Sequence, residues 1–213
     1  MIDSEEAARH WLEGLPEWDA LAAERITMLI ALLVEENQRQ NLVSAGSLAQ
    51  VWLRHIADSA QLLLHVPRET GASWLDLGTG AGFPGLVIAA LRPECAVWMV
   101  DSRKGRIAWL EQARIALGLD QAKVIGATLE QVPTQTVRVI SARAFAPLPR
   151  LLDLSARFST ADTQFVLPKG RSARQELADL ADWRHRFHVE QSLTDPDAGI
   201  VVGQLLGKTG ENR

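Results

Sequence analysis

A glycine-rich segment, DLGTGAGFPG at Asp76–Gly85, constrains the fold of this 213-residue chain more than any other feature. It begins within an apolar run of strand length, Trp74–Leu77, and three of its glycines fit the pattern G-x-G-x-x-G. Asp101 ends the next apolar run, 19 residues after Gly82. Glycines at a strand-to-helix turn let the backbone bend sharply and approach a ligand, and an acid on the next strand can hold two ribose hydroxyls. The pattern therefore predicts an open parallel sheet that binds a nucleoside-containing ligand.

From Ser73 onward, short apolar runs alternate with helical segments, which is typical of a parallel sheet covered on both faces. Helices are clearest over Arg103–Leu117 and Ser172–Asp182. Only Gln191–Gly199 separates the last two runs, too little for a helical crossover, so these two strands should pair antiparallel. We therefore predict an α/β, Rossmann-like fold with a mostly parallel seven-stranded sheet and a C-terminal antiparallel hairpin. The seven expected strands are Trp74–Leu77, Val97–Asp101, Lys123–Ile125, Val137–Ser141, Phe165–Leu167, Phe187–Glu190 and Ile200–Leu206.

The first seventy or so residues show a helical period instead. Apolar residues recur at helical spacing over Asp19–Asn37 and over Ser47–Val66, and a shorter helix is expected over Ser4–Leu12. We expect an N-terminal helical cap over residues 1–71, a Rossmann-like cofactor-binding domain over 72–207 and a flexible tail over 208–213.

Composition excludes several classes of protein. The chain has no run of about 18 apolar residues, and its start is polar and acidic, so we expect neither membrane insertion nor secretion but a cytoplasmic protein. Cys95 is the single cysteine and histidines do not cluster with it, so neither an internal disulfide nor a metal site is expected. The net charge of −4 argues against a general nucleic-acid coat.

The glycine pattern by itself fits two cofactor classes, a dinucleotide and S-adenosylmethionine. Pro84 has no amide N–H to offer a pyrophosphate and suits the first helical position, so the helix should begin there, with Phe83 extended before it. Asp76 precedes the glycines, where its carboxylate would repel a pyrophosphate but attract the ammonium of a methionine moiety. The loop also follows a long helical segment rather than opening the chain. These features favour S-adenosylmethionine.

A dinucleotide remains an alternative, as does the interpretation that the glycines only form a tight turn while Asp76 and Asp101 cap helices.

Motifs along most of the chain are similar to those of one family, the bacterial RsmG family, also called glucose-inhibited division protein B. This resemblance implies a class I methyltransferase fold and a 16S ribosomal RNA (guanine-N7)-methyltransferase activity that uses S-adenosyl-L-methionine. The motifs are NLVS at Asn41–Ser44, RHIADS at Arg54–Ser59, the glycine segment, VDS at Val100–Ser102, SARAFAPL at Ser141–Leu148 and LPKG at Leu167–Gly170.

The resemblance also assigns residues to the cofactor. It implies contacts at Gly78, Phe83, Leu129, Glu130 and Arg143, with Leu129 and Glu130 near the adenine. The glycine pattern and strand ends add Asp76, Gly80 and Asp101 to this set, with Asp101 on the ribose. Arg143, at the end of the fourth expected strand, can face either the cofactor carboxylate or the target nucleotide.

Candidate RNA contacts are Arg54 and His55 in the cap, and Lys169 and Arg171 after the fifth expected strand. Arginine and lysine grip phosphates and set the register without specifying sequence. A solvated helix face for these cations, and a structural role for His55, remain alternative interpretations.

The implied chemistry requires no catalytic base, because guanine N7 already presents an in-plane lone pair to the methyl group. The sequence agrees, since it has none of the N-P-P-[YFW] or D-P-P-Y motifs used on exocyclic amines. We expect a monomer whose partner is 16S ribosomal RNA or the small ribosomal subunit. Two other hypotheses stay open at this point: a Rossmann oxidoreductase, and a non-catalytic module that binds RNA or assembly factors.

Overall fold

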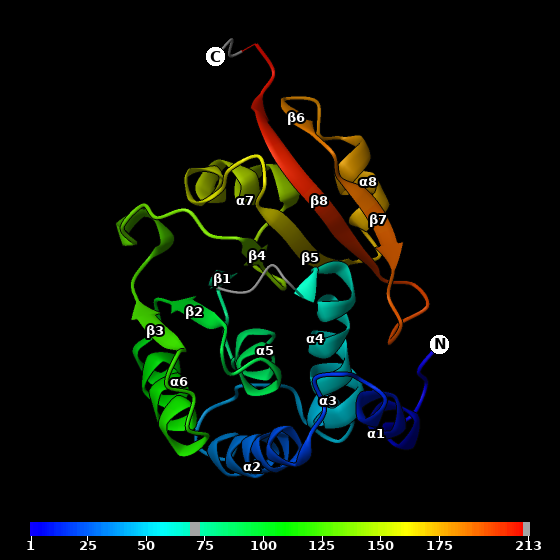
Figure 1. Ribbon diagram of the computed structural model, residues 1–213, viewed down its shortest axis with the longest axis vertical. Coiled ribbons are helices and arrows are strands. Elements are labelled where there is room, and N and C mark those ends of the chain that lie inside the picture. The colour runs from blue at the N-terminus through cyan, green and yellow to red at the C-terminus, as the bar shows by residue number, and fades with distance from the viewer. Residues whose placement is uncertain (69–72, 211–213) are drawn as a thin grey trace.

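A computed structural model describes residues 1–68 and 73–210. Its eight-stranded sheet has the order β3-β2-β1-β4-β5-β8-β6, with β7 also paired to β8 (Figure 1). The first five strands are parallel, and β8 is antiparallel to all three of its neighbours. This confirms the predicted α/β class and the antiparallel C-terminal pair. The strands are β1 Ser73–Leu77, β2 Ala96–Asp101, β3 Lys123–Gly126, β4 Val139–Ser141, β5 Gln164–Gly170, β6 Trp183–His185, β7 His188–Gln191 and β8 Gly199–Lys208.

The prediction of seven strands was wrong at the sheet edge, where two short strands replace one. β6 and β7 pair with successive parts of β8, which place His185 opposite Leu205 and His188 opposite Val202. Between these pairs Gly203 has a φ of 142°, and a Cβ there would lie 2.3 Å from the carbonyl oxygen of Arg186. The edge is therefore broken where the chain passes directly over a glycine of β8. The predicted tail falls partly in β8, which ends at Lys208, and partly in residues 211–213, outside the described residues.

Helices cover both faces of the sheet because successive strand residues point to opposite sides. On one face, Trp74, Val97 and Val166 join the cluster formed with α5 and α6, while on the other Leu75 and Phe165 join the cluster formed with α7 and α8. The helix predicted over 172–182 is shorter than expected, and α5 begins one residue after Pro84, which precedes it in a helical conformation. The helices are α5 Gly85–Leu91, α6 Lys104–Ala116, α7 Leu148–Ser155 and α8 Ala173–Ala178, with short 3₁₀ turns at Leu129–Gln131 and Ala156–Phe158.

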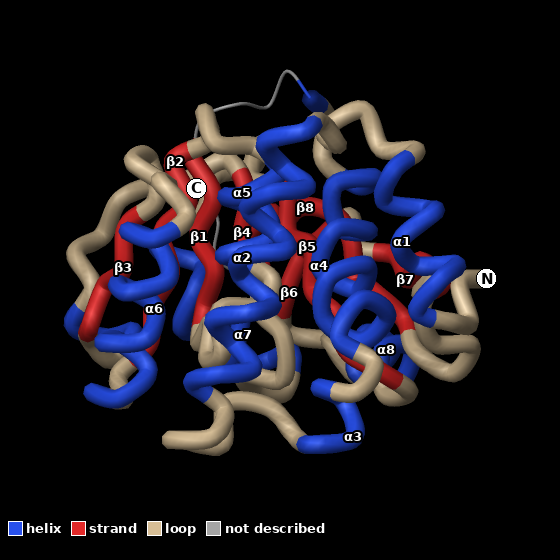
Figure 2. The backbone as a smooth tube through the Cα atoms, turned by 90° about the horizontal axis from the view of Figure 1, so that it is seen from below, coloured by secondary structure: helices blue, strands red, loops and turns tan. Residues whose placement is uncertain are grey.

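The N-terminal helices lie on the α5 side of the sheet, and α2, α4 and α5 overlie the strands when the molecule is seen from below (Figure 2). The first two begin at side-chain caps, with Ser4 accepting from the amide of Ala7 and Asp19 from that of Ala22. The single helix predicted over 47–66 is instead α3 followed by a helix that changes type along its length. The elements are α1 Glu5–Glu13, α2 Ala20–Glu36, α3 Ala45–Leu48, a π-helical segment Trp52–Ala57, α4 Asp58–Ala60 and a 3₁₀ segment Gln61–His65. No helix among residues 1–68 and 73–210 is long and apolar enough to cross a membrane.

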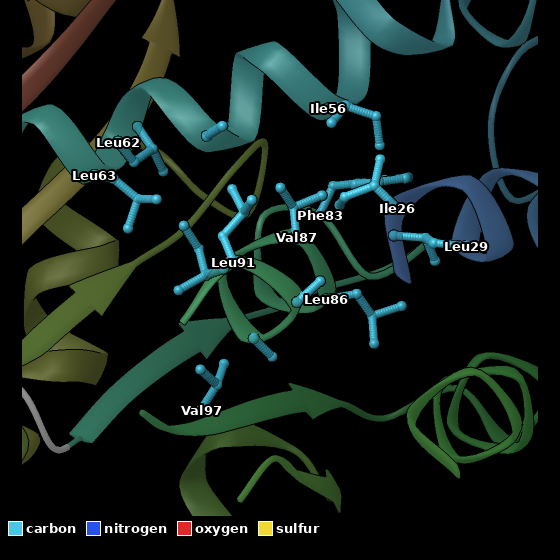
Figure 3. Packing of buried hydrophobic residues seen from close by; sticks show 14 of the residues in the cluster. Ile26, Leu29, Ile56, Leu62, Leu63, Phe83, Leu86, Val87, Leu91 and Val97 are labelled. Carbon is cyan, nitrogen blue, oxygen red and sulfur yellow. The ribbon is translucent and has the colours of Figure 1, made fainter. Parts of the chain in front are cut away.

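The cap and the glycine-loop helix share one hydrophobic core (Figure 3). Ile26 and Leu29 of α2 face Leu86 of α5. Ile56 and Leu62 approach from the continuous helix Trp52–His65, which we call the cap helix. All five side chains are fully buried. Because burying a large aliphatic side chain contributes about 1.5–3 kcal/mol, this shared core fixes α5, and with it the loop that precedes α5, against the cap.

A second contact between cap and loop is aromatic. His55 is stacked on Phe83 of the glycine loop, with ring centroids 4.8 Å apart, and both rings are buried. Burial lowers the pKa of His55 to about 3, helped by the positive charges of Arg143 and Arg54. The imidazole is therefore neutral at physiological pH.

Replacing His55 should change the pH dependence of stability. Histidine in an unfolded chain titrates near 6.5, so below this pH the unfolded state binds a proton that the folded state binds only near pH 3. Acidification from about pH 7.5 to about pH 5 should thus cost the wild type on the order of 2 kcal/mol of unfolding free energy through this group. His55→Gln should lack this loss in urea titrations at the two pH values. His10→Gln, which replaces an exposed histidine, should keep it. An undiminished pH dependence in His55→Gln would contradict the neutral buried imidazole.

Candidate active site

The glycine loop follows β1 in a conformation that only glycine adopts readily. Gly78, Gly80 and Gly82 have φ values of 64°, 62° and 99°. A Cβ at Gly78 would lie 2.4 Å from the ring of Phe145, and one at Gly82 would lie 2.3 Å from a Leu86 methyl group. The loop therefore needs glycine for its backbone angles and for its close contacts.

Asp76 holds the end of this loop from the protein interior. Its side chain is fully buried and accepts hydrogen bonds from the Ser141 hydroxyl at 2.7 Å and from the Gly85 amide at 3.0 Å. Ser141 in turn accepts from the Trp74 indole at 2.8 Å. Burial raises the pKa of the Asp76 carboxyl, and these hydrogen bonds oppose that rise. Asp76 ties β1 to β4 and to the first residue of α5, and it is not among the described residues that line either pocket reported below.

Asp101 holds the loop at Gly80 and also lines a pocket. Its two carboxylate oxygens accept from the Gly80 amide at 3.1 Å and from the Arg103 amide at 2.8 Å. The Thr79 amide donates to the carbonyl of Val100 at 3.0 Å, which closes the loop onto the end of β2. The carboxylate at the end of β2 is thus held by amides of the protein's own backbone.

The first pocket lies at the carboxyl ends of β1, β2, β3 and β4 and has a volume of about 470 Å³. This is the edge at which open parallel sheets bind ligands, and the volume is within the usual range for a small-molecule site. It brings together four of the predicted cofactor residues, Gly78, Asp101, Leu129 and Glu130. The rest of its wall comes from Val100, Ser102, Arg103, Arg106, Ala127, Thr128, Ala144, Phe145, Ala146, Pro147, Arg150 and Leu154.

The other predicted cofactor residues lie around the first pocket without lining it. Gly80 directs its amide to Asp101, and Phe83 packs against His55. Arg143 lies with its guanidinium 5.3 Å from the centre of the Phe83 ring and faces a second pocket.

The second pocket, of about 600 Å³, meets the first along Ala144–Pro147, which lines both. It lies between the cap helix, the end of β5 and the turn before β8. Three cations and three carboxylates line it, and they pair with one another: Arg54 with Asp195 at 3.3 Å, Arg143 with Asp58 at 3.2 Å and Lys169 with Glu176 at 3.0 Å. Its remaining described lining is Gln61, Pro168, Gly170, Ser172, Ser192, Ala198, Gly199 and Ile200.

Arg143 connects the cap to the end of β4. Besides Asp58, it donates to the carbonyl of Arg54 at 3.3 Å and lies 3.4 Å from Nδ1 of His55. Asp58 also accepts from Gln61 at 2.9 Å and from Thr194. The motif RHIADS therefore meets the motif ARAFA through a polar network as well as through the apolar core.

Lys169 holds the segment shared by the two pockets. Its ammonium donates to the carbonyl of Ala146 at 2.5 Å and pairs with Glu176, and its side chain is only 7% exposed. Glu176 accepts from the amide of Leu148, the first residue of α7, at 2.7 Å. The shared segment is thus fixed near its end by an ion pair whose lysine is 7% exposed.

Among the predicted RNA contacts, Arg54 and Lys169 line the second pocket, whereas His55 and Arg171 do not. His55 is buried against Phe83. Arg171 is 83% exposed and pairs with Asp197 at 2.7 Å. The structure therefore places Arg54 and Lys169 in the second pocket, buries His55 and leaves Arg171 on the surface.

Sequence reasoning missed Phe145, Asp58, Glu176 and Asp195. Phe145 lies in the motif SARAFAPL and Asp58 in the motif RHIADS, so these motifs could have indicated both residues. Glu176 and Asp195 meet Lys169 and Arg54 only in the folded chain, and Asp195 is 141 residues from Arg54.

Comparison with known proteins gives a consistent result. Residues 22–194 match the family described as rRNA small subunit methyltransferase G. The chain is 57% identical over 210 residues to the Ribosomal RNA small subunit methyltransferase G of Erythrobacter litoralis, which covers 98% of this chain and 100% of the relative. It is 55% identical to the protein of that name from Novosphingobium aromaticivorans, with 95% and 89% covered.

Solved structures agree on the fold alone. A mutant of MtNAS in complex with S-adenosylmethionine has a TM-score of 0.58 at 17% identity, with 95% of this chain and 84% of that chain covered. The mitomycin 7-O-methyltransferase MmcR has a TM-score of 0.56 at 13% identity, with 94% and 72% covered. The predicted Rossmann-like methyltransferase fold is confirmed, and so is the resemblance carried by the motifs: this chain belongs to the rRNA small subunit methyltransferase G family.

Proposed function

We propose that the protein transfers the methyl group of S-adenosylmethionine to N7 of a guanine in 16S ribosomal RNA. The observation that carries this proposal is the pair of pockets that meet at Ala144–Pro147, one formed around the glycine loop and one facing the cap. A transferase needs two binding sites in contact, and family membership makes ribosomal RNA the acceptor.

The first pocket fits the cofactor by its shape and its chemistry. Gly78 lines the pocket beside the ring of Phe145, which leaves no room for a Cβ, and Asp101 presents a carboxylate at the end of β2, where a ribose binds in folds of this type. Leu129 and Glu130 follow β3 and lie where an adenine would be read. When bound, S-adenosylmethionine supplies an electrophilic methyl group on a sulfonium.

Arg143 and Asp76 act around the cofactor in this proposal. The guanidinium of Arg143 is held at the junction of the two pockets by Asp58, where it can balance the carboxylate of the methionine moiety. Asp76 holds the loop through Gly85 and Ser141. It does so from a buried position outside the described lining of the first pocket.

The protein's task at the acceptor is alignment. Guanine N7 attacks through its own lone pair, so no side chain has to remove a proton, and positioning the reactants can contribute about 7–11 kcal/mol in favourable systems. The shared segment, held by Lys169, sets the separation between the two reactants. N7 lies in the deep major groove of duplex RNA, which side chains cannot read, so the target should be unpaired when it is methylated.

We further propose that the protein acts as a monomer in the cytoplasm, on 16S ribosomal RNA or on the small subunit. A dinucleotide oxidoreductase is disfavoured by membership of a methyltransferase family. A non-catalytic module is disfavoured because the glycine loop and the acid of the cofactor pocket are both intact and joined by a hydrogen bond from Gly80 to Asp101.

The experiment for this function measures methyl incorporation from labelled cofactor into small subunits that lack the modification. Chemical cleavage specific for N7-methylguanine then maps the product. We expect one methyl group per subunit at a single guanine. Transfer to an exocyclic amine, or no transfer although the cofactor binds, would refute the proposal.

Gly78→Asp should abolish cofactor binding, because the new Cβ would displace the ring of Phe145, which also lines the first pocket, and the side chain adds a negative charge. Isothermal titration with S-adenosylhomocysteine should detect a loss of at least about a hundredfold in affinity, or about 2.7 kcal/mol. Gly118→Asp is the matched control, since its φ of 62° carries the same backbone strain and no atom lies within 4 Å of its Cβ position. It should bind the cofactor like the wild type. Near-normal affinity in Gly78→Asp would show that the cofactor binds elsewhere.

A further inference from the structure

The second pocket has a charge balance that suits an uncharged heterocycle. Its three described cations are each paired with a carboxylate, so the lining carries no formal excess of either sign. A phosphate inside the pocket would be repelled by its three carboxylates, whereas a nucleobase can use donors and acceptors already present. The volume of about 600 Å³ also accommodates a purine with part of its ribose.

One of the three carboxylates has acceptor capacity to spare. Asp58 and Glu176 each serve three side-chain or backbone donors, whereas Asp195 serves two. Asp195 is also the most exposed of the three, at 32% against 21% and 22%. The donors to Asp58 are Gln61, Thr194 and Arg143, and those to Glu176 are Ser172, Leu148 and Lys169.

Asp195 is nevertheless held in place. One carboxylate oxygen accepts from the amide of Asp197 at 3.0 Å, which fixes the side chain within its own turn. The other accepts from Arg54 at 3.3 Å in a pair whose arginine is 44% exposed, and exposed pairs of this kind contribute little. Arg54 can therefore turn toward an RNA phosphate and leave a positioned carboxylate oxygen for a ligand.

Guanine offers the matching edge. Its N1–H and its N2 amino group are two neighbouring donors, and an ionised carboxylate is an acceptor with two oxygens. N7 lies on the opposite edge of the purine, so it stays free when the Watson–Crick edge is bound. Adenine presents an acceptor at N1, which a carboxylate repels.

We infer that the second pocket binds the target guanine and that Asp195 is its specificity-determining residue, accepting from N1–H and the N2 amino group. This inference rests on the proposed function, since it names how that function selects its base. The guanine would enter between Arg54 and Lys169 with N7 toward Ala144–Pro147, where the first pocket begins.

The test compares guanosine with inosine at the mapped target nucleotide, in reconstituted small subunits. Inosine keeps N7 and N1–H but lacks the N2 amino group. Wild-type kcat/KM should fall about tenfold or more with inosine, because a hydrogen bond to a charged acceptor is lost. Asp195→Asn and Asp195→Ala should both bring the two substrates within about threefold of each other, mainly by slowing the reaction of guanosine.

Asp197→Asn is the matched control, in the same turn but outside the described lining of the pocket, and it should keep the wild-type preference. Affinity for S-adenosylhomocysteine should be unchanged in all three variants, because Asp195 and Asp197 lie outside the first pocket. A full preference for guanosine in both Asp195 variants would overturn the inference and leave the proposed function intact. Failure of the wild type to methylate N7 of the guanosine substrate would instead refute the proposed function.

Discussion

Two carboxyl groups near the ends of neighbouring parallel strands hold the glycine loop, which contributes Gly78 to the lining of the first pocket. Asp76 accepts from the first amide of α5, and Asp101 accepts from the amide of Gly80. A buried carboxylate is costly unless it is hydrogen-bonded, and bonds from backbone amides to an ionised acceptor are among the stronger ones. The loop satisfies these carboxylates and is shaped by them. The acids expected to bind a ligand therefore first order the backbone that surrounds it.

The segment Ala144–Pro147 connects this loop to the rest of the site. Phe145 lies against Gly78 on one side, and the carbonyl of Ala146 accepts from Lys169 on the other. A lysine that is 7% exposed and paired with Glu176 has little freedom to follow a phosphate. Lys169 therefore positions the shared segment, and the RNA contact expected from the sequence stays a prediction.

The sequence was most informative where the signal is local. Strand β2 ends at Asp101 as expected, because a run of apolar residues followed by an acid is readable without its neighbours. The broken edge at Gly203 was not predictable, since it depends on where Arg186 crosses β8. Pairing was equally hidden, because Arg54 and Asp195 are 141 residues apart and the sequence does not show that this arginine has a carboxylate partner. Asp76 shows the same limit: its position before the glycines predicts a ligand contact, which stays a prediction, but it could not show that the buried carboxyl group also bonds Ser141 and Gly85.

Two pockets meet at Ala144–Pro147, and we propose that they hold the cofactor and the base on either side of that segment. A crystal structure of the protein with S-adenosylhomocysteine and guanosine monophosphate tests this claim most directly. We predict the adenosine in the first pocket beside Asp101 and Leu129, the sulfur turned toward Ala144–Pro147, and the guanine in the second pocket with N7 facing that sulfur. A guanine bound outside the second pocket, or with N7 turned away from the cofactor, would contradict the account.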